Sequence, residues 1–166
     1  DLVLDDLNGD GIAEFAVGAY CTDRLGNNNG GSVTAFDGAT GQMLWMTNGD
    51  SEDERLGHCM QRLGDINGDG ACDLVVGAYR DRLGGLKSGS VHVLSGVNGT
   101  RLYTVIEDED GAEFGKSVAV ISDLNGDGHN EWISGAWLSN TNGLFSGKVS
   151  LHSGSDGKKL RSWAGP

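Results

Sequence analysis

The sequence predicts an all-β protein built from three repeats of one four-stranded antiparallel unit. A nonapeptide of the form Asp-x-Asn-Gly-Asp-Gly-x-x-Asp/Glu begins at Asp6, Asp65 and Asp123. The differences between these residue numbers are 59 and 58, a period typical of supersecondary units that pack on one another. The chain also has 29 glycines, one proline and no amphipathic stretch of helical length, which favours strands joined by tight turns.

The first unit illustrates the expected elements. Residues 1–5 end a strand that runs into the first nonapeptide, and the apolar run 15–20 leaves it. That run is too short and too rich in glycine for a helix. The alternating segment 32–36 is the third expected strand, and the Asp-Gly-Ala-Thr-Gly turn at 37–41 joins it to a fourth at 42–46.

The second and third units repeat this order. Their expected strands are 58–63, 74–79, 90–94 and 101–105, then 116–121, 132–137, 148–152 and 159–163. Four strands joined by hairpins form a blade of the propeller type. We therefore expect a single repeat domain over residues 1–166, with about three propeller-like blades at about 1–48, 54–106 and 112–164.

The repeated nonapeptide has the chemistry of a calcium loop. Its positions 1, 3, 5 and 9 carry oxygen-bearing side chains, and Ca²⁺ binds six to eight oxygens from carboxylates, amides and backbone carbonyls. Glycine at position 6 lets the chain turn back, so that the carbonyl of position 7 is a further expected ligand. The predicted ligands of three Ca²⁺ sites are Asp6, Asn8, Asp10, Ile12 and Glu14; Asp65, Asn67, Asp69, Ala71 and Asp73; and Asp123, Asn125, Asp127, His129 and Glu131.

Two other interpretations of the nonapeptide are weaker. Asn-Gly and Asp-Gly form turns without a metal, but a turn does not need four oxygens in the same register three times. An EF-hand loop needs a bidentate glutamate at position 12, where this chain has Val17, Val76 and Gly135. Short strands, and no helices, are expected on either side of each loop.

Composition limits the partners and the compartment. The net charge is −12, from 24 acidic and 12 basic residues, which argues against nucleic-acid binding. No apolar run approaches the roughly 20 residues that span a membrane. Loops of this kind suit millimolar extracellular calcium. Asn98-Gly-Thr is a glycosylation sequon in an expected turn, which also favours a secreted or cell-surface protein.

The three cysteines leave one unpaired in any disulfide scheme. Cys21 follows the second strand of the first unit and Cys59 opens the first strand of the second unit. Both positions lie at the same edge of a four-stranded meander, so we expect Cys21 and Cys59 to form a disulfide across the first blade interface, with Cys72 as the free thiol.

The repeats resemble the FG-GAP repeats of integrin alpha-subunit β-propellers. Three marks carry the resemblance: Leu56-Gly57 and Phe114-Gly115 before the loops; Gly18-Ala19-Tyr20, Gly77-Ala78-Tyr79 and Gly135-Ala136-Trp137 after them; and Gly31-Ser-Val33, Gly89-Ser-Val91 and Gly147-Lys-Val149 before the third strands. The resemblance implies calcium-binding propeller blades outside the cell. It leaves function open, because the family includes adhesion receptors and secreted lipid hydrolases.

We expect no enzyme. The four histidines, 58, 92, 129 and 152, fall in unlike contexts, and no Gly-x-Ser-x-Gly elbow occurs. The leading hypothesis is a non-catalytic extracellular calcium-binding scaffold for adhesion or interaction. The alternatives are the propeller portion of a larger secreted enzyme and a structural subunit of an extracellular filament.

The expected partners are other blades of the same or another chain. Both faces of a blade pack on neighbours, and integrin propellers have seven blades, so we expect a piece of a longer array, a ring or a filament. The unlike loops 21–30, 80–88 and 138–146 would hold a protein or glycan ligand.

Overall fold

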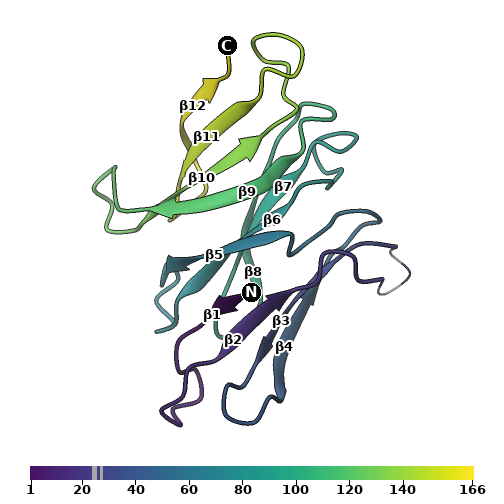
Figure 1. The fold of residues 1–166 in the computed structure, drawn as a ribbon. Coiled ribbons are helices and arrows are strands. Elements are labelled where there is room, and N and C mark those ends of the chain that lie inside the picture. Colours follow the sequence, from purple (N-terminus) through teal and green to yellow (C-terminus); the bar gives the residue numbers. More distant parts are fainter. Residues whose placement is uncertain (24–25, 27) are drawn as a thin grey trace.

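The computed structural model describes residues 1–23, 26 and 28–166 and contains three four-stranded antiparallel sheets, with no helix in that part of the chain (Figure 1). The strands are β1 Leu2–Val3, β2 Phe15–Gly18, β3 Ser32–Phe36 and β4 Met43–Asn48; β5 Cys59–Gly64, β6 Asp73–Ala78, β7 Ser90–Leu94 and β8 Arg101–Ile106; and β9 Phe114–Ile121, β10 Glu131–Ala136, β11 Lys148–Ser153 and β12 Lys159–Ala164. The all-β, blade-like prediction is confirmed. Residues 24, 25 and 27 of the expected loop 21–30 lie outside the described residues.

Each sheet is a meander in which every strand pairs with its neighbours in sequence. The strands match their predicted positions within a few residues. The differences reach two residues, as at the start of β9, which begins at Phe114 instead of residue 116. A register shift between Gly135 and Ala136 lets Phe114 pair with Ala136, and this irregularity draws the Phe-Gly pair into the strand.

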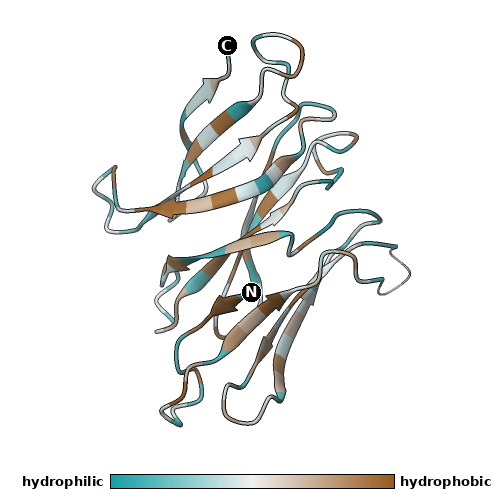
Figure 2. Ribbon diagram, in the orientation of Figure 1, coloured by the Kyte–Doolittle hydropathy of each residue, from teal (hydrophilic) through white to brown (hydrophobic). Residues whose placement is uncertain are grey.

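The three sheets are stacked in chain order (Figure 1), and a hydrophobic core lies on each face of the middle sheet. Side chains of a strand alternate between faces. In β6, Leu74 and Val76 therefore pack in the core against the first sheet, while Val75 packs in the core against the third. Figure 2 shows hydrophobic stretches in the strands at the centre of the stack and hydrophilic ones in the loops at its edges. Two separate hydrophobic cores thus join three sheets.

The segment that enters each following sheet closes these cores. Leu56 and Phe114 are 0% and 1% exposed, and each forms a parallel bridge to a glycine of the preceding unit, Gly31 or Gly89. Gly115 comes next with φ of 85°, and a Cβ there would lie 2.2 Å from the carbonyl oxygen of Ser90. Only glycine fits this close passage, which explains the repeated apolar-Gly pair in physical terms.

The outer faces of the stack are less covered. All six residues of β12 are exposed, in contrast to the fully buried β7. Val3 and Phe15 are exposed on the first sheet, and Val149 and Trp163 on the third. A surface hollow of about 500 Å³ lies beside Val149, Trp163 and Trp137. A largely apolar hollow is what a sheet face without a packed neighbour would present.

Candidate metal-binding loops

The same hydrogen bonds shape all three nonapeptides. In the first, Asp6 Oδ1 accepts from the amide of Gly9 at 2.7 Å and Asp6 Oδ2 accepts from the amide of Gly11 at 2.8 Å. Asn8 Oδ1 accepts from the Asp10 amide at 2.8 Å, and Asp10 Oδ1 accepts from the Ile12 amide at 2.8 Å. The equivalent bonds of the second loop involve Asp65, Asn67, Asp69 and Ala71, and those of the third Asp123, Asn125, Asp127 and His129. The side chains at positions 1, 3 and 5 are thereby drawn inward.

The first and third loops each bring three carboxylates together. Asp6, Asp10 and Glu14 offer oxygens within 4.8 Å of one another, and so do Asp123, Asp127 and Glu131. These are six of the predicted ligands. Carboxylates at this separation repel one another unless a cation lies between them.

The glutamates at position 9 have an unsatisfied oxygen. Glu14 and Glu131 are each 0% exposed, and one oxygen of each accepts a hydrogen bond from a loop amide, of Leu7 or Leu124. The other oxygen, Oε1, is buried and has no hydrogen-bond partner in the described part of the chain. A buried carboxylate oxygen without a partner is costly. A hard cation bound to Oε1 and to the two aspartates would remove that cost, so these residues fit Ca²⁺.

The second loop differs because its last acid is an aspartate. Asp73 Oδ2 accepts from the Ile66 amide at 2.8 Å and Oδ1 accepts from the Gly96 amide at 3.1 Å, so both oxygens are satisfied. Burial raises the pKa of Asp73, and the charges of Asp69 and Asp65 add to that rise. Although all of this loop is described, its three carboxylates do not gather as those of the other loops do. All three expected calcium sites stay predictions, and the second loop gives its site the least support.

A hairpin turn contacts each loop through a side-chain hydrogen bond, and this contact was not predicted from the sequence. The contacting residue is Asp37 directly after β3, Ser95 directly after β7, or Ser153 at the end of β11. Asn8 donates to Asp37 at 2.8 Å, whereas Ser95 donates to Asp69 at 2.9 Å and Ser153 donates to Asp127 at 3.1 Å. In the third loop, bonds from the His129 amide, Asn125, Ser155 and Ser153 lower the pKa of Asp127 to about 2. The common position of these three residues in the repeat was the available signal.

The expected disulfide is not formed, and all three cysteines are free thiols. Cys21 is exposed, and its sulfur accepts from Arg55 at 2.8 Å. Cys59 Sγ lies 3.3 Å from the Gly115 carbonyl, so it faces the third sheet rather than the first. The disulfide prediction was wrong because it required the Cys59 side chain to point toward the first sheet.

The remaining predicted residues lie at the surface or between sheets. Asn98 is exposed in the turn between β7 and β8, where its Oδ1 accepts from the Thr100 amide, and its glycosylation stays a prediction. Tyr79 packs between sheets, with His58 at 4.5 Å between ring centroids and the Lys116 ammonium 3.6 Å from its ring centroid. Trp137, at the equivalent position of the third sheet, is 54% exposed.

A second group of acids and a histidine is fully buried. Glu54, Asp81 and His92 also offer ligand-type atoms within 4.8 Å of one another. The sequence did not reveal this group because its members come from a connector, a loop and a strand, and share no sequence pattern.

Comparisons with known proteins agree with this architecture. No family model matches the chain. Integrin alpha-4 of Xenopus laevis is 27% identical over 148 residues, which are 82% of this chain and 14% of that protein. The crystal structure of the rhamnogalacturonan lyase YesW is similar with a TM-score of 0.59 at 17% identity, over 99% of this chain and 34% of that one. The chain thus spans a minor part of either protein. The first likeness supports a relationship to β-propeller proteins, and the second supports the fold alone.

Where the structure describes the chain, it contains no helix that is long and apolar enough to span a membrane.

Proposed function

We propose that this chain is a non-catalytic, calcium-binding interaction scaffold of FG-GAP-like blades that acts outside the cell. The observation that carries the proposal is the buried, unpartnered Oε1 of Glu14 and of Glu131, each beside two loop aspartates. Carboxylate oxygens in this arrangement are the ligands that Ca²⁺ prefers. The similarity to an integrin alpha chain supports the extracellular location and the interaction role.

Calcium would act on the rigidity of the stack. The first loop is held by Asp6, Asp10 and Glu14, and Glu14 lies directly before β2. Neutralising these acids would fix the loop between β1 and β2, and the equivalent acids would do the same between β9 and β10. Because an unfolded chain cannot hold such a site, binding stabilises the native state. The product is a rigid frame on which the loops at the sheet edges can recognise a protein or a glycan.

The partner that best fits the end of the stack is a further blade, from the same or another chain. At the two inner interfaces, a Cβ on Gly18 or Gly77 would lie 2.1 Å from the backbone of the following sheet. The equivalent Gly135 has only Ser117 Oγ, at 3.1 Å, near it among the described residues. The hollow beside Val149 and Trp163 is also lined by Gly135. A blade packed there would complete a third interface like the other two.

Calorimetric titration with Ca²⁺ tests the central part of the proposal. Glu14→Gln and Glu131→Gln each remove one of the three carboxylate charges of a loop, and Glu52→Gln removes one carboxylate charge from an exposed connector position. We expect each loop variant to lose or weaken one binding event by about tenfold or more, since a buried charged ligand is worth at least about 1.4 kcal/mol. The Glu52 variant should bind as the parent does. A parent protein that shows no calcium binding would rule the proposal out.

A further inference from the structure

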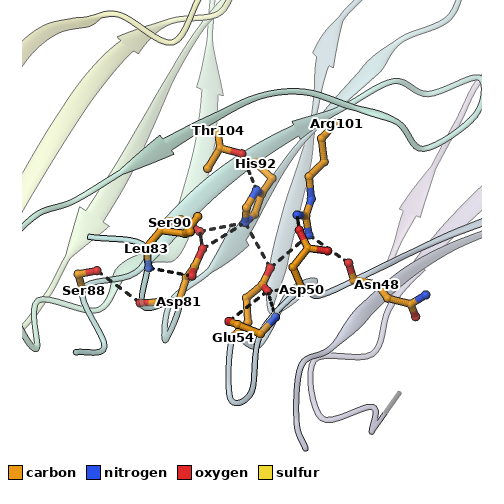
Figure 3. Close-up of polar contacts among 11 residues, drawn as sticks. Asn48, Asp50, Glu54, Asp81, Leu83, Ser88, Ser90, His92, Arg101 and Thr104 are labelled. Atoms are coloured by element: carbon orange, nitrogen blue, oxygen red, sulfur yellow. Dashed lines mark hydrogen bonds and ion pairs between the residues drawn. The ribbon is translucent and has the colours of Figure 1, made fainter. Parts of the chain in front are cut away.

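A buried polar cluster lies where the connector after β4 crosses the second sheet. Glu54 of the connector, Asp81 of the loop after β6 and His92 of β7 are 2%, 2% and 1% exposed. Figure 3 shows the imidazole between the two carboxylates, with Nε2 3.4 Å from Glu54 Oε1 and 3.6 Å from Asp81 Oδ2. The cluster therefore ties the connector to the sheet that follows it.

Hydrogen bonds fix the proton on Nε2 of His92. Ser90 Oγ donates to Asp81 Oδ2 at 2.6 Å, so its lone pair is left to accept from His92 Nε2 at 2.9 Å. The other ring nitrogen, Nδ1, lies 2.8 Å from Thr104 Oγ1. A threonine hydroxyl can donate to a neutral ring or accept from a protonated one. The proton that His92 gains or loses is therefore the one on Nδ1.

Charge balance favours the protonated ring. Arg101 Nη2 lies 3.3 Å from Glu54 Oε1, and Arg101 also pairs with the exposed Asp50. Among the buried groups, Glu54 thus has a guanidinium beside it, and an imidazolium supplies a second positive charge, which also lies beside Asp81. Burial alone lowers the pKa of His92, but the nearby carboxylates of Asp81 and Glu54 outweigh burial and raise it. Burial raises the pKa of Asp81, but the bonds from His92 and Ser90 outweigh that and lower it.

The next interface uses a cation of another kind. Between the second and third sheets, Lys148 Nζ lies 2.6 Å from Glu107 Oε2 and 3.8 Å from Glu109 Oε2. A lysine stays charged across the neutral range, whereas histidine is the side chain that titrates there. Of these two ion-pair clusters, the one around His92 is therefore the one whose cation can lose its charge in the neutral range.

We propose that His92 is a pH-sensitive clamp on the connector between the first two sheets: its imidazolium holds Glu54 and Asp81 together, and its deprotonation as the pH rises loosens the connector. Glu54 Oε2 also accepts from the amides of Asp50 at 2.6 Å and Ser51 at 3.0 Å, so the connector turn responds with it. A histidine with a raised folded-state pKa gives its full stabilisation below the unfolded value of about 6.5. That stabilisation is lost as the pH rises through the folded-state value.

An NMR titration of the parent protein in saturating calcium tests the clamp directly. Between pH 5.5 and 8.5, the His92 ring should titrate above the value of about 6.5 for free histidine. The amide signals of Asp50 and Ser51 should shift with the same midpoint. The range ends at pH 8.5 because burial raises the pKa of Cys59 to about 11, and its thiolate in the unfolded chain would add a separate loss of stability. A His92 midpoint at or below 6.5, or amides that do not follow it, would overturn the proposal.

Two variants separate the clamp from packing. His92→Gln keeps hydrogen-bonding groups but does not titrate. His152→Gln changes another buried histidine, which stacks on Trp132 and has no carboxylate hydrogen-bond partner among the described residues. From pH 6.5 to 8.5, the thermal midpoint of the parent and of the His152 variant should fall by at least about 2 °C, and that of the His92 variant should stay level. An equal fall in the His92 variant would contradict the clamp, and if this variant does not fold, the parent titration decides.

Discussion

Gly77→Ala is the substitution that most sharply tests how the sheets are stacked. Gly77 lies in β6 of the middle sheet, opposite Gly115 of the third sheet. A Cβ at residue 77 would lie 2.1 Å from the Gly115 carbonyl oxygen and 2.6 Å from Cys59 Sγ. Since Gly115 is backbone of the neighbouring sheet, no side-chain rotation relieves the first contact, and the two sheets must move apart.

The expected cost follows from that separation. Overpacking a core costs about 1–3 kcal/mol, and a clash with backbone belongs at or above the top of this range. We expect a loss of about 3 kcal/mol in the free energy of unfolding, which lowers the thermal midpoint by about 6–12 °C in a domain of this size. Urea and thermal unfolding in saturating calcium measure both quantities.

Gly135→Ala is the matched control. Gly135 holds the same repeat position in the third sheet, but its Cβ would meet only Ser117 Oγ, at 3.1 Å, in the part of the chain that the structure describes. A hydroxyl can rotate, so this variant should lose less than about 1 kcal/mol, within the usual range for a mild substitution. Equal losses at both glycines, or no loss at Gly77, would refute the stacking account. If a further blade covers the third sheet, the Gly135 variant should also weaken that association.

Two further substitutions test the interface contents. Phe114→Ala removes a side chain that is 1% exposed in the core between the second and third sheets. It should lower the free energy of unfolding, measured by urea denaturation, by about 3–5 kcal/mol. A loss below about 1 kcal/mol would mean that Phe114 does not close this core. Lys148→Met leaves the buried carboxylate of Glu107 without its cation and should cost about 3–5 kcal/mol, whereas the double variant with Glu107→Gln should recover much of the loss; a double variant no more stable than the single one would contradict the ion pair.

Much of the fold could be predicted because the same sequence pattern occurs in all three repeats. The strand that leaves each loop, the alternating third strand and the hairpin turn recur at constant spacing, so β3 and β7 have the predicted bounds. The start of β9 could not be predicted, because its pairing depends on the register shift beside Gly135. Local pattern gives the strands, and the contact between sheets sets where they begin.

The candidate site was predictable to the level of the loop, and less so to the level of the atom. The spacing of oxygen-bearing residues identified the loops. In the second loop the last acid is Asp73 instead of a glutamate, and both of its oxygens accept hydrogen bonds from backbone amides. The direction of Cys59 and the meeting of Glu54 with His92 depend on how one sheet packs on the next. Those contacts join residues that share no sequence pattern.

The unfolding midpoint with and without calcium tests the central claim most directly. At free calcium a hundredfold above the dissociation constant, each occupied site adds about 2.7 kcal/mol to the free energy of unfolding. The account predicts that calcium raises the thermal midpoint above its value in chelator by about 5–11 °C for each such site. It also predicts that Glu14→Gln and Glu131→Gln each remove part of that rise. An identical midpoint in calcium and in chelator, with no calcium bound by elemental analysis, would contradict it.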